Sequence, residues 1–205
     1  MGKYFIAILC VLLLLFAVST VNASIVGWNC ADDGDRAIVM GTPSWAETDG
    51  EYELAMHGIQ NWYPGHVAGD FSTDTLEDPT VRIIEDVFND TTFAWTDYHI
   101  TIGMSQTFSF VNSGLLTPAG WTAVVSPVSA GEIPNDGGDG YVGTIDYYKG
   151  PTGNAIAIGD DGTFGFKISF NGSISYCMQQ IPTPEPTTII LLGLGAVSVI
   201  RRKRA

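Results

Sequence analysis

Positive charge is scarce along most of this chain. The sequence has 9 Lys and Arg against 22 Asp and Glu in 205 residues. The segment from 24 to 181 keeps four basic and 21 acidic residues, so its formal charge is about −17. Such a surface repels phosphate groups, which disfavours nucleic acid and anionic lipid as partners of this segment. It suits a domain that is soluble outside the cell and that meets divalent cations or cationic partners.

Cysteine is also scarce. Of the three cysteines, Cys10 lies in an apolar N-terminal run, which leaves Cys30 and Cys177 near opposite ends of the 24–181 segment. If the chain is exported, the oxidising compartment favours a disulfide between them. The alternative is two unpaired, buried thiols. Neither cysteine has a histidine beside it in sequence, so thiol catalysis is not predicted.

Recognisable catalytic patterns are missing. The histidines His57, His66 and His99 have no close metal-ligand spacing, and the chain has no HExxH and no G-x-S-x-G segment. Acidic residues are so frequent that a pair of carboxylates carries no information about glycosidase chemistry. We therefore predict no catalytic residues and a non-enzymatic protein.

No segment sustains the 3.6-residue apolar period of an amphipathic helix. Short runs alternate instead, most clearly at Phe164, Phe166, Ile168 and Phe170, and Gly/Asp-rich turns separate them. The pattern predicts an all-β fold, with one antiparallel β-sandwich or jelly-roll-like domain over 24–181.

Two details of this domain can be predicted as well. The apolar set changes face between Ile83 and Ile84, which predicts a β-bulge within 80–88. Asp161-Gly162 and Asn171-Gly172 are hairpin signals, and they predict a meander of strands around 155–159, 163–170 and 173–179.

The first 23 residues have the features of a secretory signal peptide. Lys3 supplies a positive start, residues 4–18 are apolar, and the small residues before Ser24 suit cleavage between Ala23 and Ser24. We expect a signal helix here and export by the Sec machinery. The alternative is a permanent N-terminal membrane helix, which the polar residues near the cleavage site disfavour.

The C-terminal end combines three features in order. Pro-rich residues 181–186 predict an extended spacer. The uncharged run 187–200 then predicts a helix of about 21 Å, which is short for a hydrocarbon core of about 30 Å. A basic cluster closes the chain and is expected to stay on the cytoplasmic side. The motif residues are Pro184, Glu185, Pro186, Arg201, Arg202, Lys203 and Arg204.

This tail, residues 182–205, resembles the PEP-CTERM sorting signal. The resemblance implies an exosortase-type sorting enzyme and transient membrane insertion of the precursor. It also implies delivery to the cell surface or extracellular matrix of a Gram-negative-type bacterium that makes extracellular polysaccharide. Residues 78–81 and 93–100 are similar to a block in β cargo domains of some PEP-CTERM proteins. The alternative for the tail is an ordinary single-span anchor.

Two candidate binding sites follow from loop composition. Aspartates on Gly-rich loops offer the hard oxygens that Ca²⁺ prefers, although none matches an EF-hand loop and the same residues also make turns. The calcium candidates are Asp32, Asp33, Asp35, Asp136, Asp139, Asp160 and Asp161. Trp62 and Tyr63, in a turn segment, are candidates for stacking on sugars; the alternative is that Trp62 pins this loop to the core.

These observations favour a non-enzymatic, exported surface or matrix protein. The first alternative is a lectin-like β-sandwich that binds carbohydrate, with Ca²⁺ as a possible ligand. The second is a hydrolase on the same fold whose motif is not recognisable.

Overall fold

The computed structural model describes residues 24–48, 51–76 and 78–184. The predicted signal helix and C-terminal hydrophobic helix lie outside this part of the chain. So do the sorting-motif residues after Pro184 and one side of the predicted signal cleavage site, namely Glu185, Pro186, Arg201, Arg202, Lys203, Arg204 and Ala23. Within the described ranges there is no helix long and apolar enough to cross a membrane.

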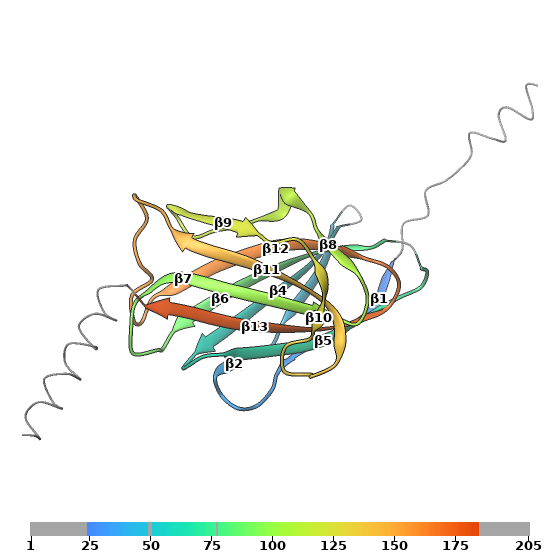
Figure 1. The fold of residues 1–205 in the computed structure, drawn as a ribbon, viewed down its shortest axis with the longest axis horizontal. Helices are drawn as coiled ribbons and strands as arrows, with labels where there is room; N and C mark the ends of the chain where they lie inside the picture. Colours follow the sequence, from blue (N-terminus) through green and yellow to red (C-terminus); the bar gives the residue numbers. More distant parts are fainter. Residues whose placement is uncertain (1–23, 49–50, 77, 185–205) are drawn as a thin grey trace, which may run out of the picture.

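The described chain is all-β and forms two sheets (Figure 1). We call the seven-stranded one sheet A and the six-stranded one sheet B. Sheet A has the order β1 (Ile25–Asp32), β5 (Gly65–Thr73), β13 (Ile174–Pro184), β7 (Trp95–Met104), β11 (Asp139–Lys149) and β10 (Ser129–Glu132), and β9 (Trp121–Val125) also pairs with β11. Sheet B has the order β2 (Ile38–Met40), β4 (Glu51–Gln60), β6 (Thr80–Asn89), β12 (Asp161–Phe170) and β8 (Phe108–Phe110), and β3 (Ser44–Thr48) also pairs with β4. A 3₁₀ turn, η1 (Asn112–Gly114), follows β8.

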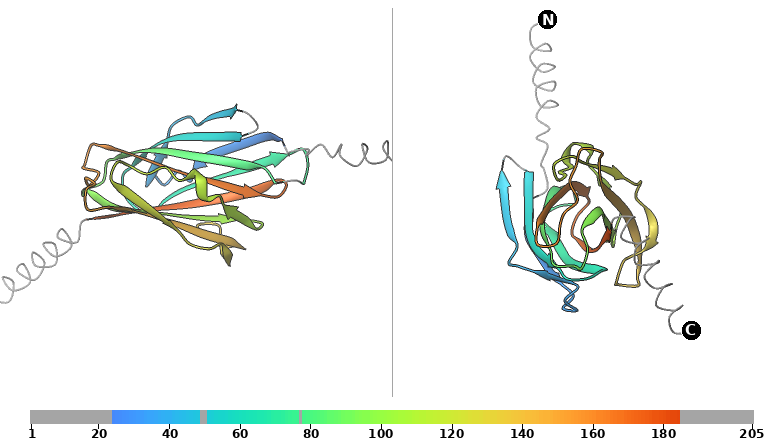
Figure 2. Two further views of the ribbon diagram at one scale, coloured as in Figure 1. Left: turned by 90° about the horizontal axis from the view of Figure 1, so that it is seen from above. Right: turned by 90° about the vertical axis from the view of Figure 1, so that its left-hand side faces the viewer.

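The core lies between the inner faces of the two sheets, which appear as two layers in Figure 2. Tyr98 of sheet A stacks on Phe164 of sheet B with ring centroids 4.3 Å apart. Phe71 and Phe170 stack across the same gap at 5.4 Å. The alternating set on β12 is buried as the sequence predicts, because every second side chain of a strand points to the same face.

The pairing of the strands differs from the expectation in two ways. β12 and β13 follow each other in the chain but lie in different sheets, so Asn171 and Gly172 cross between layers and the predicted meander is wrong. Around Ile156 the chain makes only an isolated bridge to Trp95. In addition, β4 and β6 pair in parallel, whereas the other described ladders are antiparallel. Alternation shows which face of a strand is buried, but it does not identify the neighbouring strand.

The predicted bulge in β6 is also wrong. β6 keeps an unbroken register with both β4 and β12. Its inward set is Val81, Ile83, Glu85 and Val87, so the strand places a carboxylic acid in the core where the sequence suggested a change of face. The adjacent Ile84 points to the other side of the sheet.

The predicted disulfide is wrong as well, since Cys30 and Cys177 are both free. They flank β5, with Cys30 opposite Gly69 and Cys177 opposite Ala68. Strands two positions apart are about 9.5 Å apart, and a disulfide needs Cα atoms within about 7 Å. Because Ala68 and Gly69 are successive residues, the two thiols also point to opposite faces of sheet A. Cys30 Sγ lies 3.2 Å from Met56 Sδ.

The end of β13 overlaps the tail. The sequence predicts a spacer from residue 181, but β13 continues to Pro184 and pairs with β7 as far as Trp95. Pairing with β5 stops at Gln180. Pro182 and Pro184 therefore lie where β13 has no second neighbour, which is the position in a sheet that tolerates a residue without an N–H.

Candidate functional site

The candidate site lies on the outer face of sheet A, where β1, β5 and β13 run side by side. Val67 and Phe71 of β5 point into the core, so the residues that alternate with them point outward. The register sets these outward side chains in rows across the strands, with a row of small side chains between two polar rows. The rows are Asn29, Asp70 and Ser175; Ala31, Ala68 and Cys177; and His66 with Gln179.

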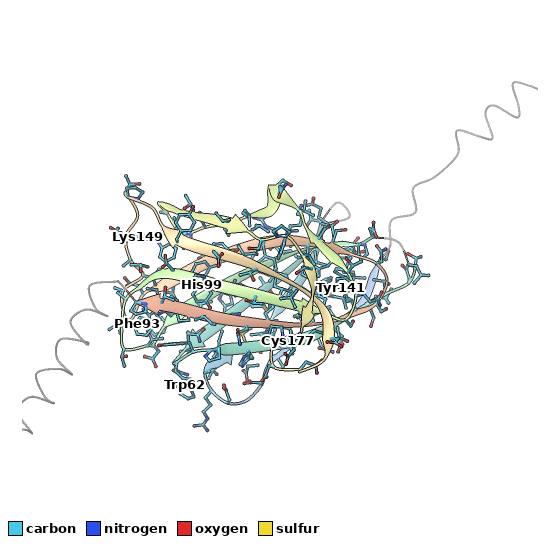
Figure 3. All side chains as sticks on the ribbon, in the orientation of Figure 1. Trp62, Phe93, His99, Tyr141, Lys149 and Cys177 are labelled. Atoms are coloured by element: carbon cyan, nitrogen blue, oxygen red, sulfur yellow. The ribbon has the colours of Figure 1, made fainter. Side chains whose placement is uncertain are left out.

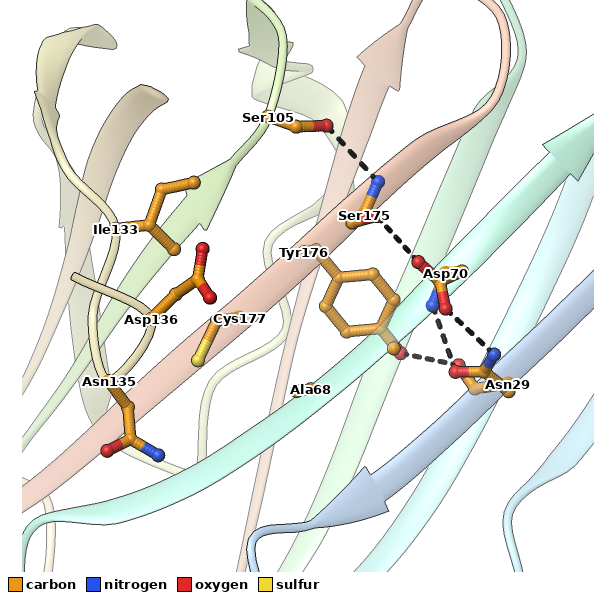
Figure 4. Close-up of a pocket in the computed structure, with 11 residues that line it drawn as sticks. Asn29, Ala68, Asp70, Ser105, Ile133, Asn135, Asp136, Ser175, Tyr176 and Cys177 are labelled. Atoms are coloured by element: carbon orange, nitrogen blue, oxygen red, sulfur yellow. Dashed lines mark hydrogen bonds between the residues drawn. The ribbon is translucent and has the colours of Figure 1, made fainter. Parts of the chain in front are cut away.

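A loop between β10 and β11 covers part of these rows and encloses a pocket of about 510 Å³ (Figure 4). Ile133, Asn135 and Asp136 of this loop line the pocket. The loop can approach the sheet because Gly103 has no side chain: a Cβ there would lie 2.6 Å from Cδ of Pro134. The pocket is therefore built from a sheet surface with small residues and a polar loop above it.

Asp70 is the centre of a hydrogen-bond network at one end of the pocket (Figure 4). Its carboxylate accepts a hydrogen bond from Ser175 Oγ at 2.6 Å and another from Asn29 Nδ2 at 2.9 Å. The Asp70 amide donates in return to Asn29 Oδ1 at 3.0 Å. The bonds from Ser175 and Asn29 favour the charged carboxylate and lower the pKa of Asp70.

At the other side of the small row, His66 lies between Asp33 and Gln179. His66 Nδ1 is 3.2 Å from Asp33 Oδ2, and its Nε2 is 3.1 Å from Gln179 Nε2. Asn135 donates to the same Asp33 oxygen at 3.2 Å, which ties the covering loop to this cluster. Burial acts to raise the pKa of Asp33, but hydrogen bonds from Asp35 and the proximity of His66 bring it below its usual value.

Ligand atoms of Asp33, Asp35 and His66 all lie within 4.8 Å of one another, so these three residues could hold a metal ion. Two carboxylates and one imidazole suit a borderline cation such as Zn²⁺ better than Ca²⁺, which prefers oxygen ligands throughout. The two carboxylates also stabilise their own turn, because Asp33 accepts a hydrogen bond from the Asp35 amide and Asp35 accepts one from the Ala37 amide.

The predicted calcium aspartates are not gathered into one site. Asp32 accepts from the Gly34 and Met40 amides and stabilises its own turn. Asp136 faces the pocket, and Asp139 begins β11 beyond it. Asp160 and Asp161 lie at the start of β12. Within the described ranges the structure joins only Asp33 and Asp35, with His66 as a partner that sequence spacing did not reveal.

Cys177 lines the pocket but is not a poised nucleophile. Burial, followed by the charges of Asp136 and Asp33, raises the pKa of its thiol to about 11. A thiol with that pKa stays protonated at neutral pH, and a protonated thiol is a weak nucleophile.

The aromatic candidates lie elsewhere. Trp62 and Tyr63 are 48% and 50% exposed in the loop between β4 and β5, and Tyr63 makes an edge contact with Phe93 at 5.8 Å. Figure 3 shows Trp62 and Phe93 away from Cys177, which marks the pocket. Among the described residues that line the pocket, only Tyr176 is aromatic.

The pocket offers carboxylates, amides and hydroxyl groups, and no lysine or arginine is among its described lining residues. Such a lining can donate to and accept from ligand hydroxyl groups, and its negative charge favours neutral or cationic ligands over anionic ones.

Comparison with known proteins identifies the tail. No curated protein and no solved structure matches the chain. The family model of the PEP-CTERM protein-sorting motif matches residues 182–204. The chain therefore carries a PEP-CTERM sorting motif at its C-terminus, the position expected for an exosortase substrate.

Proposed function

We propose that this chain is a non-enzymatic protein of the cell surface or extracellular matrix, and that residues 24–184 are the cargo that its tail delivers. The sorting motif at 182–204 carries this proposal, because it implies an exported protein that an exosortase-type enzyme processes. Export by the Sec machinery fits the predicted signal peptide, and a Gram-negative-type bacterium is the source that the resemblance of the tail implies. A β-sandwich of two packed sheets suits an exposed domain of this kind.

The chemistry of the pocket supports a role without catalysis. A general acid at neutral pH needs a raised pKa, whereas the pKa of Asp70 is lowered. The raised pKa of the Cys177 thiol keeps it protonated, and a protonated thiol is a weak nucleophile. At neutral pH Asp70 therefore lacks the proton that a general acid donates, and Cys177 lacks the thiolate that a nucleophile needs.

Expression of the full chain in a host with the exosortase-type enzyme, and in a strain that lacks it, tests this proposal. We expect the surface form in the first strain to have lost Arg201–Ala205 by intact-mass analysis. In the second strain the uncleaved precursor should remain with the inner membrane. Surface delivery of an uncleaved chain in the strain without the enzyme would contradict the proposal.

The pocket favours a second candidate function, the binding of carbohydrate. Its polar walls match the hydroxyl groups of a sugar, with Asn29, Asp70 and Ser175 at one end and Asn135 and Asp136 on the covering loop. A glycan array with the mature protein, with and without Ca²⁺, should detect neutral or amine-bearing glycans. Replacing Asp136 and Ser175 by alanine should abolish that binding, whereas Thr122→Ala on β9 should leave it unchanged. Equal binding by both variants would contradict the assignment of the pocket.

A further inference from the structure

The end of the domain at which β13 stops carries exposed apolar side chains. We call this region the exit end and define its apolar rim as Trp62, Tyr63 and Ile158. These side chains are 48%, 50% and 58% exposed. In Figures 1 and 3, Trp62 and Phe93 lie toward the end where the arrow of β13 finishes, and Tyr141 lies toward the other end.

Hydrogen bonds hold the loops of the exit end together. The Asp90 amide donates to the Gln60 carbonyl at 3.0 Å, which joins the loop after β6 to the end of β4. Asn89 Nδ2 donates to the carbonyls of Phe93 and Ile156 at 3.0 and 3.1 Å. The loops that present the rim are therefore parts of one surface.

Very few residues separate this surface from the uncharged run of the tail. Pro184 pairs with Trp95, and Thr183 Oγ1 donates to Asp97 Oδ2 at 3.2 Å, so β13 is held to β7 up to its last residue. Only Glu185 and Pro186 separate β13 from the uncharged run that begins at Thr187. An extended chain spans at most about 3.6 Å per residue, so Pro184 and Thr187 are within about 11 Å of each other.

That reach is comparable to the depth of a lipid headgroup region. The headgroups add about 5 to 8 Å on each side of the hydrocarbon core. If the run 187–200 enters the hydrocarbon, the exit end must then lie at the headgroups. Tryptophan and tyrosine are enriched at this depth because their rings are apolar with one polar group.

We propose that, while the sorting tail is inserted, the exit end of the domain rests on the membrane and its apolar rim enters the headgroup region. This inference rests on the membrane insertion that belongs to the proposed function. The lipid surface is a zwitterionic one, because exposed Asp90, Asp160 and Asp161 surround the exit end and anionic lipid would repel them. Arg36, whose carbonyl oxygen accepts a hydrogen bond from Asn61 Nδ2, lies beside the Trp62 loop, and its single positive charge does not balance the three aspartates.

The test uses the full chain in phosphatidylcholine vesicles, with and without bromine on the upper part of the acyl chains. Bromine quenches tryptophan fluorescence at close range, and the difference between wild type and Trp62→Phe isolates the signal of Trp62. We expect the Trp62 signal to be lost in brominated vesicles. Tyr63→Ser together with Ile158→Ser should restore it. The matched control replaces Leu76 and Tyr141, exposed residues at the opposite end, by serine and should leave the quenching intact.

Flotation of the vesicles distinguishes failure of the exit end to dock from failure of the tail to insert. A chain that floats but shows an unquenched Trp62 would overturn the docking of the exit end and leave the sorting function in place. A chain that does not float would overturn membrane insertion of the tail and the docking with it. If bromine leaves the Trp62 fluorescence unquenched and soluble polysaccharide changes that fluorescence, the rim stacks on sugar. That result would overturn the membrane proposal. Anionic phosphatidylglycerol should weaken the quenching at low salt.

Discussion

Glu85 makes the stability of this domain depend on pH in an unusual direction. It is 2% exposed, and neither of its carboxyl oxygens has a hydrogen-bond partner within the described part of the chain. Burial raises its pKa from 4.5 to about 8. The carboxyl is therefore protonated in the folded protein at neutral pH, whereas it is ionised in the unfolded chain.

The size and sign of the effect follow from this difference. Each pKa unit between folded and unfolded states is worth about 1.4 kcal/mol, so the stability difference from Glu85 is about 5 kcal/mol. Stability is highest below pH 4.5 with respect to this group, and it falls as the pH rises toward 8. A loss of about 5 kcal/mol is large against the 5 to 15 kcal/mol that stabilises a typical domain.

Urea unfolding of the mature protein between pH 5 and pH 9, followed by tryptophan fluorescence, measures this loss. Glu85→Leu has a similar volume and no charge to bury, so the variant should lose the pH dependence and exceed wild type by several kcal/mol at pH 9. Glu53→Gln is the matched control. Glu53 lies on the neighbouring strand β4 opposite Arg82 of β6, points to the other face, and has its carboxylate 3.9 Å from Arg82 Nη1.

Other titrating groups do not produce this result. Burial and then the charge of Glu85 raise the pKa values of Tyr98 and Tyr147 beyond the range of the experiment. The remaining groups, including the Cys30 and Cys177 thiols whose pKa values burial raises to about 11, are common to wild type and variant, so their contribution cancels in the comparison. Equal slopes for wild type and Glu85→Leu would refute the reasoning.

Three further predictions concern the pocket, the metal cluster and the tail. Gly103→Val should push Pro134 and the rest of the covering loop away from β7, lower stability by about 1 to 3 kcal/mol in urea unfolding and abolish glycan binding; unchanged binding would show that the loop does not form the site. Millimolar Ca²⁺ or micromolar Zn²⁺ should raise the melting temperature of the wild type. The rise should vanish in the double variant Asp33→Asn, Asp35→Asn and persist in the double variant Asp136→Asn, Asp139→Asn. The reverse pattern would contradict the assignment of the metal cluster. Intact-mass analysis of the surface form should find a C-terminus at or beyond Pro184, because a shorter product would have lost residues that pair with β7.

The sequence allowed the buried faces to be predicted, because alternation is a local property. Phe164, Phe166 and Phe170 are in the core as their spacing indicates. The partners of each strand depend on contacts far along the chain. The crossing from β12 in one sheet to β13 in the other therefore could not be predicted from the turn residues between them. The predicted bulge in β6 failed for a different reason. Glu85 is a charged side chain at an inward position, and such a residue breaks the apolar alternation on which strand prediction rests.

The candidate site was less accessible to sequence reasoning than the fold. Asp33 and Asp35 were candidates because acidic loops suggest cations, but His66 joins them only through the register of β1 and β5. The same register explains the failed disulfide. Cys30 and Cys177 have suitable positions in the sequence, yet a shift of one residue along β5 turns their side chains to opposite faces.

The overlap between β13 and the sorting motif connects the fold to the tail. Composition separates a β domain from a Pro-rich tail at residue 181, but the fold uses residues 182–184 as the end of a strand. Two prolines are compatible with that strand because the pairing of β13 with β5 has already stopped at Gln180. The same backbone thus completes sheet A and begins the sorting motif. A processing enzyme that acts on the folded chain must then bind residues beyond Pro184, or it must first separate the end of β13 from β7.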